Sequence, residues 1–258
     1  MKVERTEFPG AQGQRLAARL DAPEGEVRAY ALFAHCFTCG KNVVAAKRIA
    51  DALTALGIAV LRFDFTGIGS SEGEFANTTF SSNVADLVAA ADHLRKTRQA
   101  PALLIGHSLG GAAVLAAAPR VPEAVAVATV GAPATAAHVT HNFAANLDEI
   151  EANGKATVTL AGRQFTITKQ FLDDVASQNF LEGLAQMKKA LLVCHAPRDD
   201  RSCIVNMSAF FSDARQRTEW HPVRMRADRP PISRETSSWM KRRSLFRRRV
   251  PSARPRTC

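Results

Sequence analysis

The sequence predicts an α/β protein with one mostly parallel sheet flanked by helices. Over the first 200 residues, short apolar segments of strand length alternate with longer segments of helical periodicity. A glycine-rich or charged loop follows four of these apolar segments. Alternating strands and helices form right-handed crossovers, so the loops that follow the strands gather at one edge of the sheet, where ligands bind in such folds.

The expected elements begin with a hairpin. Residues 3–8 and 15–20 have strand character and flank a turn that contains Gly10. An apolar strand over 29–34 leads into the loop His-Cys-Phe-Thr-Cys-Gly, and a helix is expected over about 43–56. The elements expected next are a strand over 58–63, a helix over 80–98, a strand over 102–105, an alanine-rich helix to about 118, and strands over 125–130 and 190–194.

The segment between the last two strands, about 138–189, is too long for a plain connection and predicts a small cap. Within it, residues 157–160 and 165–168 alternate apolar and polar side chains around Ala-Gly-Arg, which indicates a hairpin, and a helix is expected from about Lys169. The predicted organisation is therefore a core over 1–200 that carries this cap, followed by a basic tail over 201–258.

Composition separates the core from the tail. The net charge of the whole chain is +10, but residues 1–200 carry 19 Lys and Arg against 20 Asp and Glu, so the excess of positive charge lies in 201–258. The N-terminus is charged and no apolar run is long enough to span a membrane, so we expect a cytoplasmic protein that does not bind membranes. Five cysteines without framework spacing predict no structural disulfide.

The sequence Gly106-His107-Ser108-Leu109-Gly110 stands between a predicted strand and a predicted helix. Glycines two positions before and after a serine permit a strained turn that lifts its hydroxyl above the sheet edge. In that turn the N–H of Leu109 points from the helix N-terminus toward an oxyanion. This pattern predicts Ser108 as a nucleophile. Nucleotide binding is the alternative for a glycine-rich turn, but the chain has no G-x-G-x-x-G or G-K-[ST] motif.

The loops His-Cys-Phe, Asp-Phe-Thr-Gly-Ile-Gly-Ser-Ser-Glu-Gly and Gly-His-Ser-Leu-Gly-Gly, each after a strand, together resemble the α/β-hydrolase superfamily. The similarity covers residues 1 to about 200 and is greatest to bacterial serine hydrolases that are often fused to an OsmC-like domain. It implies that the N–H of Phe37 is the second oxyanion donor. Cys36 replaces a glycine found in many relatives.

The resemblance also assigns the acid of a catalytic triad. It implies Asp199 in this role, whereas by chemistry alone Asp199 or Asp200 could orient an imidazole. The loop that begins at Asp64 is expected to brace its neighbours, and His107 is expected to support the sheet. Relatives place the triad histidine beyond the acid, where His221 is the only histidine of this chain and no strand precedes it.

Beyond residue 200 the alternation of strands and helices stops, and the composition turns to Arg, Pro and Ser. We hypothesise that the tail is out-of-frame sequence that replaces the last strand, the histidine loop and the last helix. The alternative is a genuine basic tail that binds nucleic acid or anionic lipid. We do not expect nucleic-acid binding, because no recognition fold is visible.

The expected function is hydrolysis of a carboxylic ester or a similar small-molecule acyl substrate, without a metal or an organic cofactor. The alternative is a catalytically impaired remnant that lacks the triad histidine. The sequence Cys36-Phe37-Thr38-Cys39 is a C-x-x-C motif. It has two interpretations: thiol chemistry, or packing of the cysteines near the oxyanion loop. Phenylalanines in the predicted cap indicate an apolar pocket: Phe143, Phe165, Phe171 and Phe180, with Leu147.

Overall fold

The computed structural model describes residues 1–179, 184 and 187–195. The chain divides into two units, Met1–Thr218 and Glu219–Cys258, and all described residues belong to the first. No helix among them combines the length and the apolar character that crossing a membrane would need.

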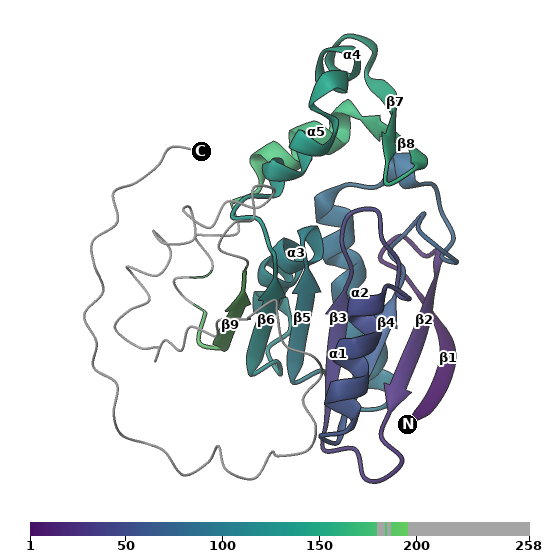
Figure 1. The fold of residues 1–258 in the computed structure, drawn as a ribbon, viewed down its shortest axis with the longest axis vertical. Coiled ribbons are helices and arrows are strands. Elements are labelled where there is room, and N and C mark those ends of the chain that lie inside the picture. Colours follow the sequence, from purple (N-terminus) through teal and green to yellow (C-terminus); the bar gives the residue numbers. More distant parts are fainter. Residues whose placement is uncertain (180–183, 185–186, 196–258) are drawn as a thin grey trace, which may run out of the picture. The chain divides into compact units, whose positions relative to one another are not determined.

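A seven-stranded sheet in the order β1-β2-β4-β3-β5-β6-β9 forms the centre of this unit (Figure 1). β1 and β2 form an antiparallel hairpin, β2 pairs antiparallel with β4, and the other neighbours are parallel. The strands are β1 (Lys2–Pro9), β2 (Arg15–Ala22), β3 (Ala29–Ala34), β4 (Ile58–Phe63), β5 (Leu103–His107), β6 (Ala126–Val130) and β9 (Ala190–Cys194). The predicted mostly parallel sheet is confirmed.

Helices cover both faces of the sheet, as β3 illustrates. Successive side chains of a strand point to opposite faces. Ala31 and Phe33 pack toward α1 (Val44–Thr54), whereas Leu32 and Ala34 belong to the larger core beneath the helices of the other face. That face carries α2 (Phe80–Thr97) and α3 (Leu109–Ala117), and short 3₁₀ turns lie at η1 (Phe75–Asn77) and η2 (Ala118–Arg120). β3 and β4, which are buried on both faces over most of their length, are almost continuously apolar.

The start of α2 is held by side chains. Thr79 precedes the helix and its hydroxyl accepts from the N–H of Ser82 at 3.1 Å, while the Ser82 hydroxyl accepts from the N–H of Thr79 at 2.9 Å. This reciprocal pair satisfies two of the N–H groups that a helix N-terminus leaves open.

The segment between β6 and β9 contributes no strand to the central sheet and is called the cap below. It comprises η3 (Ala136–Asn146), α4 (Leu147–Asn153), β7 (Lys155–Leu160), β8 (Arg163–Thr168) and α5 (Lys169–Ser177). β7 and β8 form a separate two-stranded sheet, joined by Ala161 and Gly162 with φ of 49° and 77°. Two left-handed residues are what a type I′ hairpin turn requires. η3, interrupted at Phe143, and α4 have no counterpart among the predicted elements.

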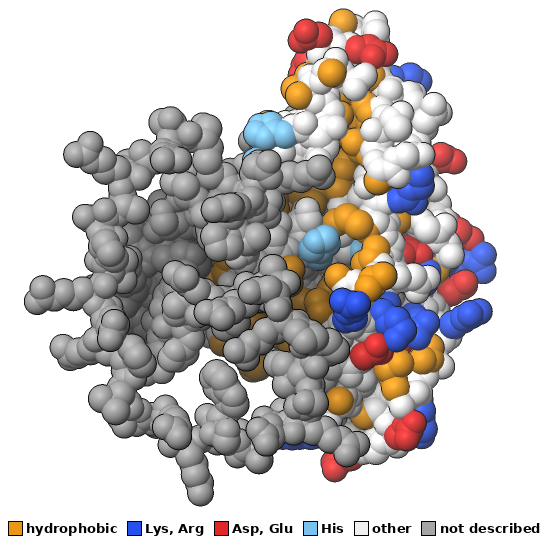
Figure 2. Space-filling view, in the orientation of Figure 1, with side chains coloured by type: hydrophobic (Ala, Val, Ile, Leu, Met, Phe, Trp, Pro, Cys, Tyr) orange, Lys and Arg blue, Asp and Glu red, His pale blue; other side chains and the backbone are white. Residues whose placement is uncertain are grey.

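The cap contacts the core at the start of α2. Asp174 of α5 accepts hydrogen bonds from the N–H of Ser81 at 2.8 Å and from its hydroxyl at 2.5 Å. Figure 2 shows hydrophobic side chains gathered on the face below the cap. In this view, acidic and basic side chains lie to the right of these hydrophobic side chains, below them and at the top of the molecule.

Candidate active site

The strained turn expected at residues 106–110 is present. Ser108 follows β5 and precedes the first residue of α3, with φ of 54° and ψ of −126°. A Cβ on Gly106 would lie 2.2 Å from the carbonyl oxygen of Gly110, so glycine is required for the strand and helix to approach so closely. The sequence therefore places a serine in a backbone conformation that costs free energy, at the carboxyl end of a central strand.

The loop after β3 lies against the N-terminus of α3. A Cβ on Gly110 would lie 2.3 Å from the carbonyl oxygen of His35. Phe37 and Leu109, the two predicted oxyanion donors, line the same small pocket. The other residues of its wall are His35, Cys36, Phe65, Asn83, Gly110 and Ala113. The fold thus brings both predicted donors together, while their role in catalysis stays a prediction.

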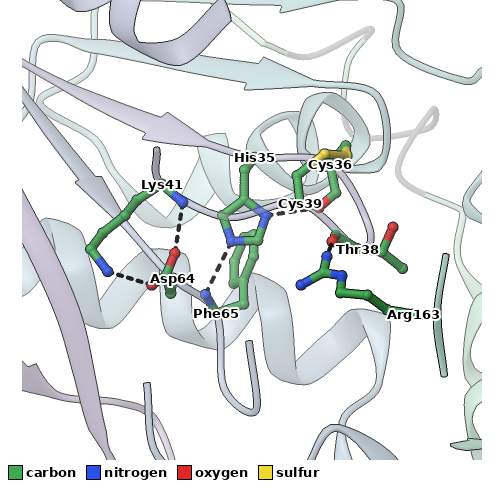
Figure 3. Close-up of a disulfide and its surroundings, with 8 residues drawn as sticks. All are labelled: His35, Cys36, Thr38, Cys39, Lys41, Asp64, Phe65 and Arg163. Carbon is green, nitrogen blue, oxygen red and sulfur yellow. Dashed lines mark hydrogen bonds and ion pairs between the residues drawn. A yellow bond between two sulfur atoms is a disulfide. The ribbon is translucent and has the colours of Figure 1, made fainter. Parts of the chain in front are cut away.

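Asp64 braces this loop, as Figure 3 shows. Its carboxylate accepts from the N–H of Lys41 at 2.6 Å and from the N–H of Ser70 at 3.0 Å, and it pairs with the ammonium group of Lys41. Asp64 is only 2% exposed. These contacts tie the loops after β3 and β4 to each other, which fits the bracing role expected for the Asp64 loop.

His35 is a neutral, buried member of the same loop. The N–H of Phe65 lies 3.3 Å from its Nε2, and its Nδ1 lies 2.7 Å from the carbonyl oxygen of Cys36. Since Nε2 accepts, Nδ1 carries the proton and donates. Burial lowers the pKa of His35 from 6.5 to about 4. The imidazole therefore stays uncharged at neutral pH and fixes the backbone next to Phe37.

Cys36 and Cys39 form a disulfide, so the prediction of no structural disulfide is wrong. The turn between them is closed by a hydrogen bond from the N–H of Cys39 to the carbonyl oxygen of Cys36 at 3.2 Å. It brings the two Cα atoms to 5.2 Å, within the range that a disulfide spans. An odd number of cysteines does not prevent one local pair, and C-x-x-C was the signal for it.

His107 lies beside this disulfide. One of its ring nitrogens and the two sulfur atoms all lie within 4.8 Å of one another. Its Nδ1 is buried without a hydrogen-bond partner in the described part of the chain, and burial lowers the pKa of His107. His107 thus faces the loop after β3. Among the described residues, no histidine is hydrogen-bonded to the Ser108 hydroxyl.

Phenylalanine rings of the core and cap converge around Phe37. Its ring centroid lies 5.4 Å from that of Phe75, 6.3 Å from that of Phe143 and 5.1 Å from that of Phe171. Phe165 of the cap hairpin lies 4.8 Å from Phe75. This aromatic cluster, defined by Phe37, Phe75, Phe143, Phe165 and Phe171, forms an apolar region beside the predicted oxyanion loop.

Three predicted site residues, Asp199, Asp200 and His221, lie outside the described residues, as does Phe180. The strand that leads toward Asp199 is described, however. β9 runs parallel to β6, and the N–H of Gly131 donates to the carbonyl oxygen of Cys194 at 2.8 Å. The carboxyl end of β9 therefore lies at the same sheet edge as Ser108.

Residues 25–163 match the model of the family described as serine aminopeptidase, S33. The chain belongs to this family of the α/β-hydrolase superfamily. It is 32% identical over 206 residues to palmitoyl-protein thioesterase ABHD10 of Mus musculus, which covers 77% of this chain and 65% of that protein. It is also 34% identical over 113 residues to the monoglyceride lipase of Rattus norvegicus, covering 43% of this chain and 37% of the lipase.

Among solved structures, this chain resembles the esterase domain of a Rhodothermus marinus protein, with 45% identity, a TM-score of 0.64, and coverage of 83% of this chain and 84% of that domain. Mouse α/β-hydrolase domain-containing protein 10 shares the fold at 24% identity and a TM-score of 0.65, over 81% of this chain and 84% of that one. The chain spans less than two thirds of the curated thioesterases of mouse and rat, 65% and 54%.

Proposed function

We propose that this chain is a serine hydrolase of carboxylic esters or thioesters, with Ser108 as its nucleophile. The observation that carries the proposal is the position of Ser108, which has a left-handed backbone at the N-terminus of α3 and stands one residue before Leu109 in the pocket wall that also contains Phe37. The hydroxyl attacks the acyl carbon, and the N–H groups of Leu109 and Phe37 stabilise the resulting oxyanion. Asp199 is the proposed acid of the triad.

The base of the triad is not assigned. In the superfamily the histidine follows the acid in the chain, and His221 is the only histidine beyond Asp199. A genuine tail would make His221 the candidate for this role, whereas out-of-frame sequence from about residue 201 would leave the triad without its histidine. If the imidazole of His221 accepts the proton of the Ser108 hydroxyl, the substitution His221→Gln lowers the rate of acylation by several orders of magnitude.

The aromatic cluster supports an apolar acyl group. Phe37 carries one proposed oxyanion donor on its backbone, and its side chain packs among cap rings, so an acyl chain that extends from the reacting carbonyl would meet apolar surface. The names of the mouse thioesterase and the rat lipase are consistent with acyl substrates. We propose esters and thioesters of medium to long fatty acids over acetate esters.

A fluorophosphonate probe tests the nucleophile. Folded wild-type protein is expected to become covalently labelled, and the Ser108→Ala variant is expected to remain unlabelled at the same folded fraction. Ser70→Ala is the matched control, because Ser70 also lies in a loop after a strand but is held against Asp64. Absence of labelling in folded wild-type protein would contradict the proposal and favour a hydrolase-like remnant without a working triad.

A series of p-nitrophenyl esters tests the acyl group. We expect kcat/KM to rise from acetate to octanoate in the wild type, and Phe171→Ala to flatten that rise while leaving the rate with acetate within about threefold, since each buried methylene is worth about 0.8 kcal/mol. A preference for acetate would overturn the proposed acyl specificity without affecting the assignment of Ser108.

A further inference from the structure

We propose that Cys36 and Cys39 form a redox-active disulfide, which dithiol compounds reduce and which controls the order of the loop that carries Phe37. The consequence for catalysis rests on the proposed function, whereas the thiol chemistry does not.

The pair is accessible and has a proton acceptor. Cys36, Cys39 and His107 are each partly exposed, and we expect a small reductant to reach the sulfur atoms. One ring nitrogen of His107 lies within 4.8 Å of both sulfur atoms, so the imidazole is placed beside the pair. A neutral imidazole can take the proton of a nearby cysteine thiol, and the resulting thiolate is the reactive form in exchange.

The chemistry is thiol–disulfide exchange. A thiolate of the reductant attacks one sulfur of the pair, the Cys36–Cys39 bond breaks, and the second cysteine leaves as a thiolate that takes up a proton. The other thiol of the reductant then attacks the mixed disulfide and releases the first cysteine. Two electrons and two protons pass to the protein, and the dithiol becomes a disulfide. In the reverse direction His107 accepts the proton of the cysteine that attacks.

The disulfide closes a short loop whose other constraints are all non-covalent. Cys36 directly precedes Phe37, and the carbonyl oxygen of Thr38, between the two cysteines, accepts a hydrogen bond from Arg163 of the cap hairpin (Figure 3). Beyond Cys39 the chain is fixed by the contacts of Lys41 with Asp64. Reduction therefore removes the covalent restraint on residues 36–39 and leaves the Phe37 N–H held only by non-covalent contacts, while His35 stays bound to Phe65 and Lys41 to Asp64.

The exchange is measured on the intact chain, with EDTA present to exclude metal binding by the reduced pair. Native protein is equilibrated in buffers with increasing ratios of reduced to oxidised dithiothreitol, trapped with N-ethylmaleimide and mapped by peptide mass. We expect Cys36 and Cys39 to become alkylated together without denaturant. If both react only after unfolding, the disulfide is purely structural and the proposal is wrong.

His107→Gln tests the proton acceptor. In the reduced protein at neutral pH, this substitution is expected to slow alkylation of the pair about tenfold, the effect of a thiol pKa raised by one unit. His93→Gln, a partly buried histidine on α2, is the matched control and leaves the rate unchanged. Equal rates in wild type and His107→Gln would remove His107 from the mechanism.

The effect on the loop has two readouts. Amide hydrogen exchange at residues 36–39 should rise at least tenfold on reduction while α2 is unaffected. On reduction, the rate of fluorophosphonate labelling at Ser108 should fall at least threefold in the wild type. It should fall equally in Cys194→Ser, which retains the Cys36–Cys39 pair. In Cys39→Ser, which cannot form the disulfide, the reductant should not change the rate. If the rate of amide hydrogen exchange at residues 36–39 does not change on reduction, the disulfide does not control the order of this loop. If the fluorophosphonate never labels the oxidised protein, the proposed function fails. Cysteine alkylation and amide hydrogen exchange still decide whether the disulfide is redox-active and orders the loop.

Discussion

Gly110 faces the carbonyl oxygen of His35 so closely that a Cβ on Gly110 would lie 2.3 Å from it. The N-terminus of α3 and the loop after β3 thus meet backbone to backbone. Because neither of these two backbones can move aside as a flexible side chain could, the distance between Leu109 and Phe37 is set by this contact. The proposed oxyanion site depends on the absence of one methyl group.

Gly110→Ala tests this contact. The added methyl group must push the helix and the loop apart, and we expect a loss of about 2–3 kcal/mol in the free energy of unfolding, measured by urea denaturation. Gly25→Ala is the control, because a Cβ there meets nothing within 4 Å. If both variants unfold at the same urea concentration, the close approach is not as described.

Ser108→Gly tests the strain of the turn. A φ of 54° with a ψ of −126° is open to glycine but costly for serine. We therefore expect Ser108→Gly to be about 1 kcal/mol more stable than Ser108→Ala, although both lose the hydroxyl. Thermal unfolding of the two variants measures the difference. Equal stability would mean that the backbone at this position is unstrained.

His35 makes stability depend on pH. Its pKa is about 4 in the folded protein and near the ordinary 6.5 after unfolding, so the unfolded chain binds more protons between these values. The stabilising effect is present above pH 6.5 and is lost as pH falls toward 4. Between about pH 7 and about pH 4.5, wild type should lose about 2 kcal/mol more than His35→Gln, in urea unfolding.

His141→Gln is the control for that experiment, since His141 is an exposed histidine of the cap. It should retain the wild-type dependence on pH. A His35→Gln variant with the full acid sensitivity of the wild type would show that another group is responsible.

Asp21→Asn tests a buried ion pair. Arg62, 1% exposed, donates from Nε to Asp21 Oδ2 at 2.7 Å, and Asp21 is fully buried. Removing the charge of Asp21 leaves this guanidinium uncompensated and also breaks the pair between Asp21 and Arg19, and we expect a loss of about 3 kcal/mol in the free energy of unfolding. Lys47→Met, which breaks an exposed pair with Asp51, should cost less than about 0.5 kcal/mol. Similar costs for both would contradict the burial of Arg62.

The sequence predicted the core elements because apolar segments bounded by glycine or charged residues correspond closely to buried parallel strands. The strand expected over 29–34 is β3 (Ala29–Ala34), and the one over 190–194 is β9 (Ala190–Cys194). The region of η3 and α4 was not predicted, since it is interrupted at Phe143 and has no clear helical period. Short irregular helices depend on packing beneath the cap more than on local pattern.

The candidate site could be predicted only where one short motif determines both the backbone conformation and the reactive side chain. Gly106 to Gly110 defined a turn, and the structure shows it. The Cys36–Cys39 bond was missed because composition argued against it, while its spacing allowed it. The contact of Arg163 with Thr38 joins residues far apart in sequence, and no local pattern announces such a pairing.

The cap hairpin shares no strand with the central sheet, and the cap as a whole begins after β6 and ends before β9, two strands that lie side by side. Because these two strands are parallel, the chain leaves the sheet at the carboxyl end of β6 and re-enters it at the amino end of β9, so the insertion is also the crossover between them. A shortened cap must therefore keep enough residues to run back along the length of β9. A deletion that joined the two strands directly could not preserve their parallel pairing.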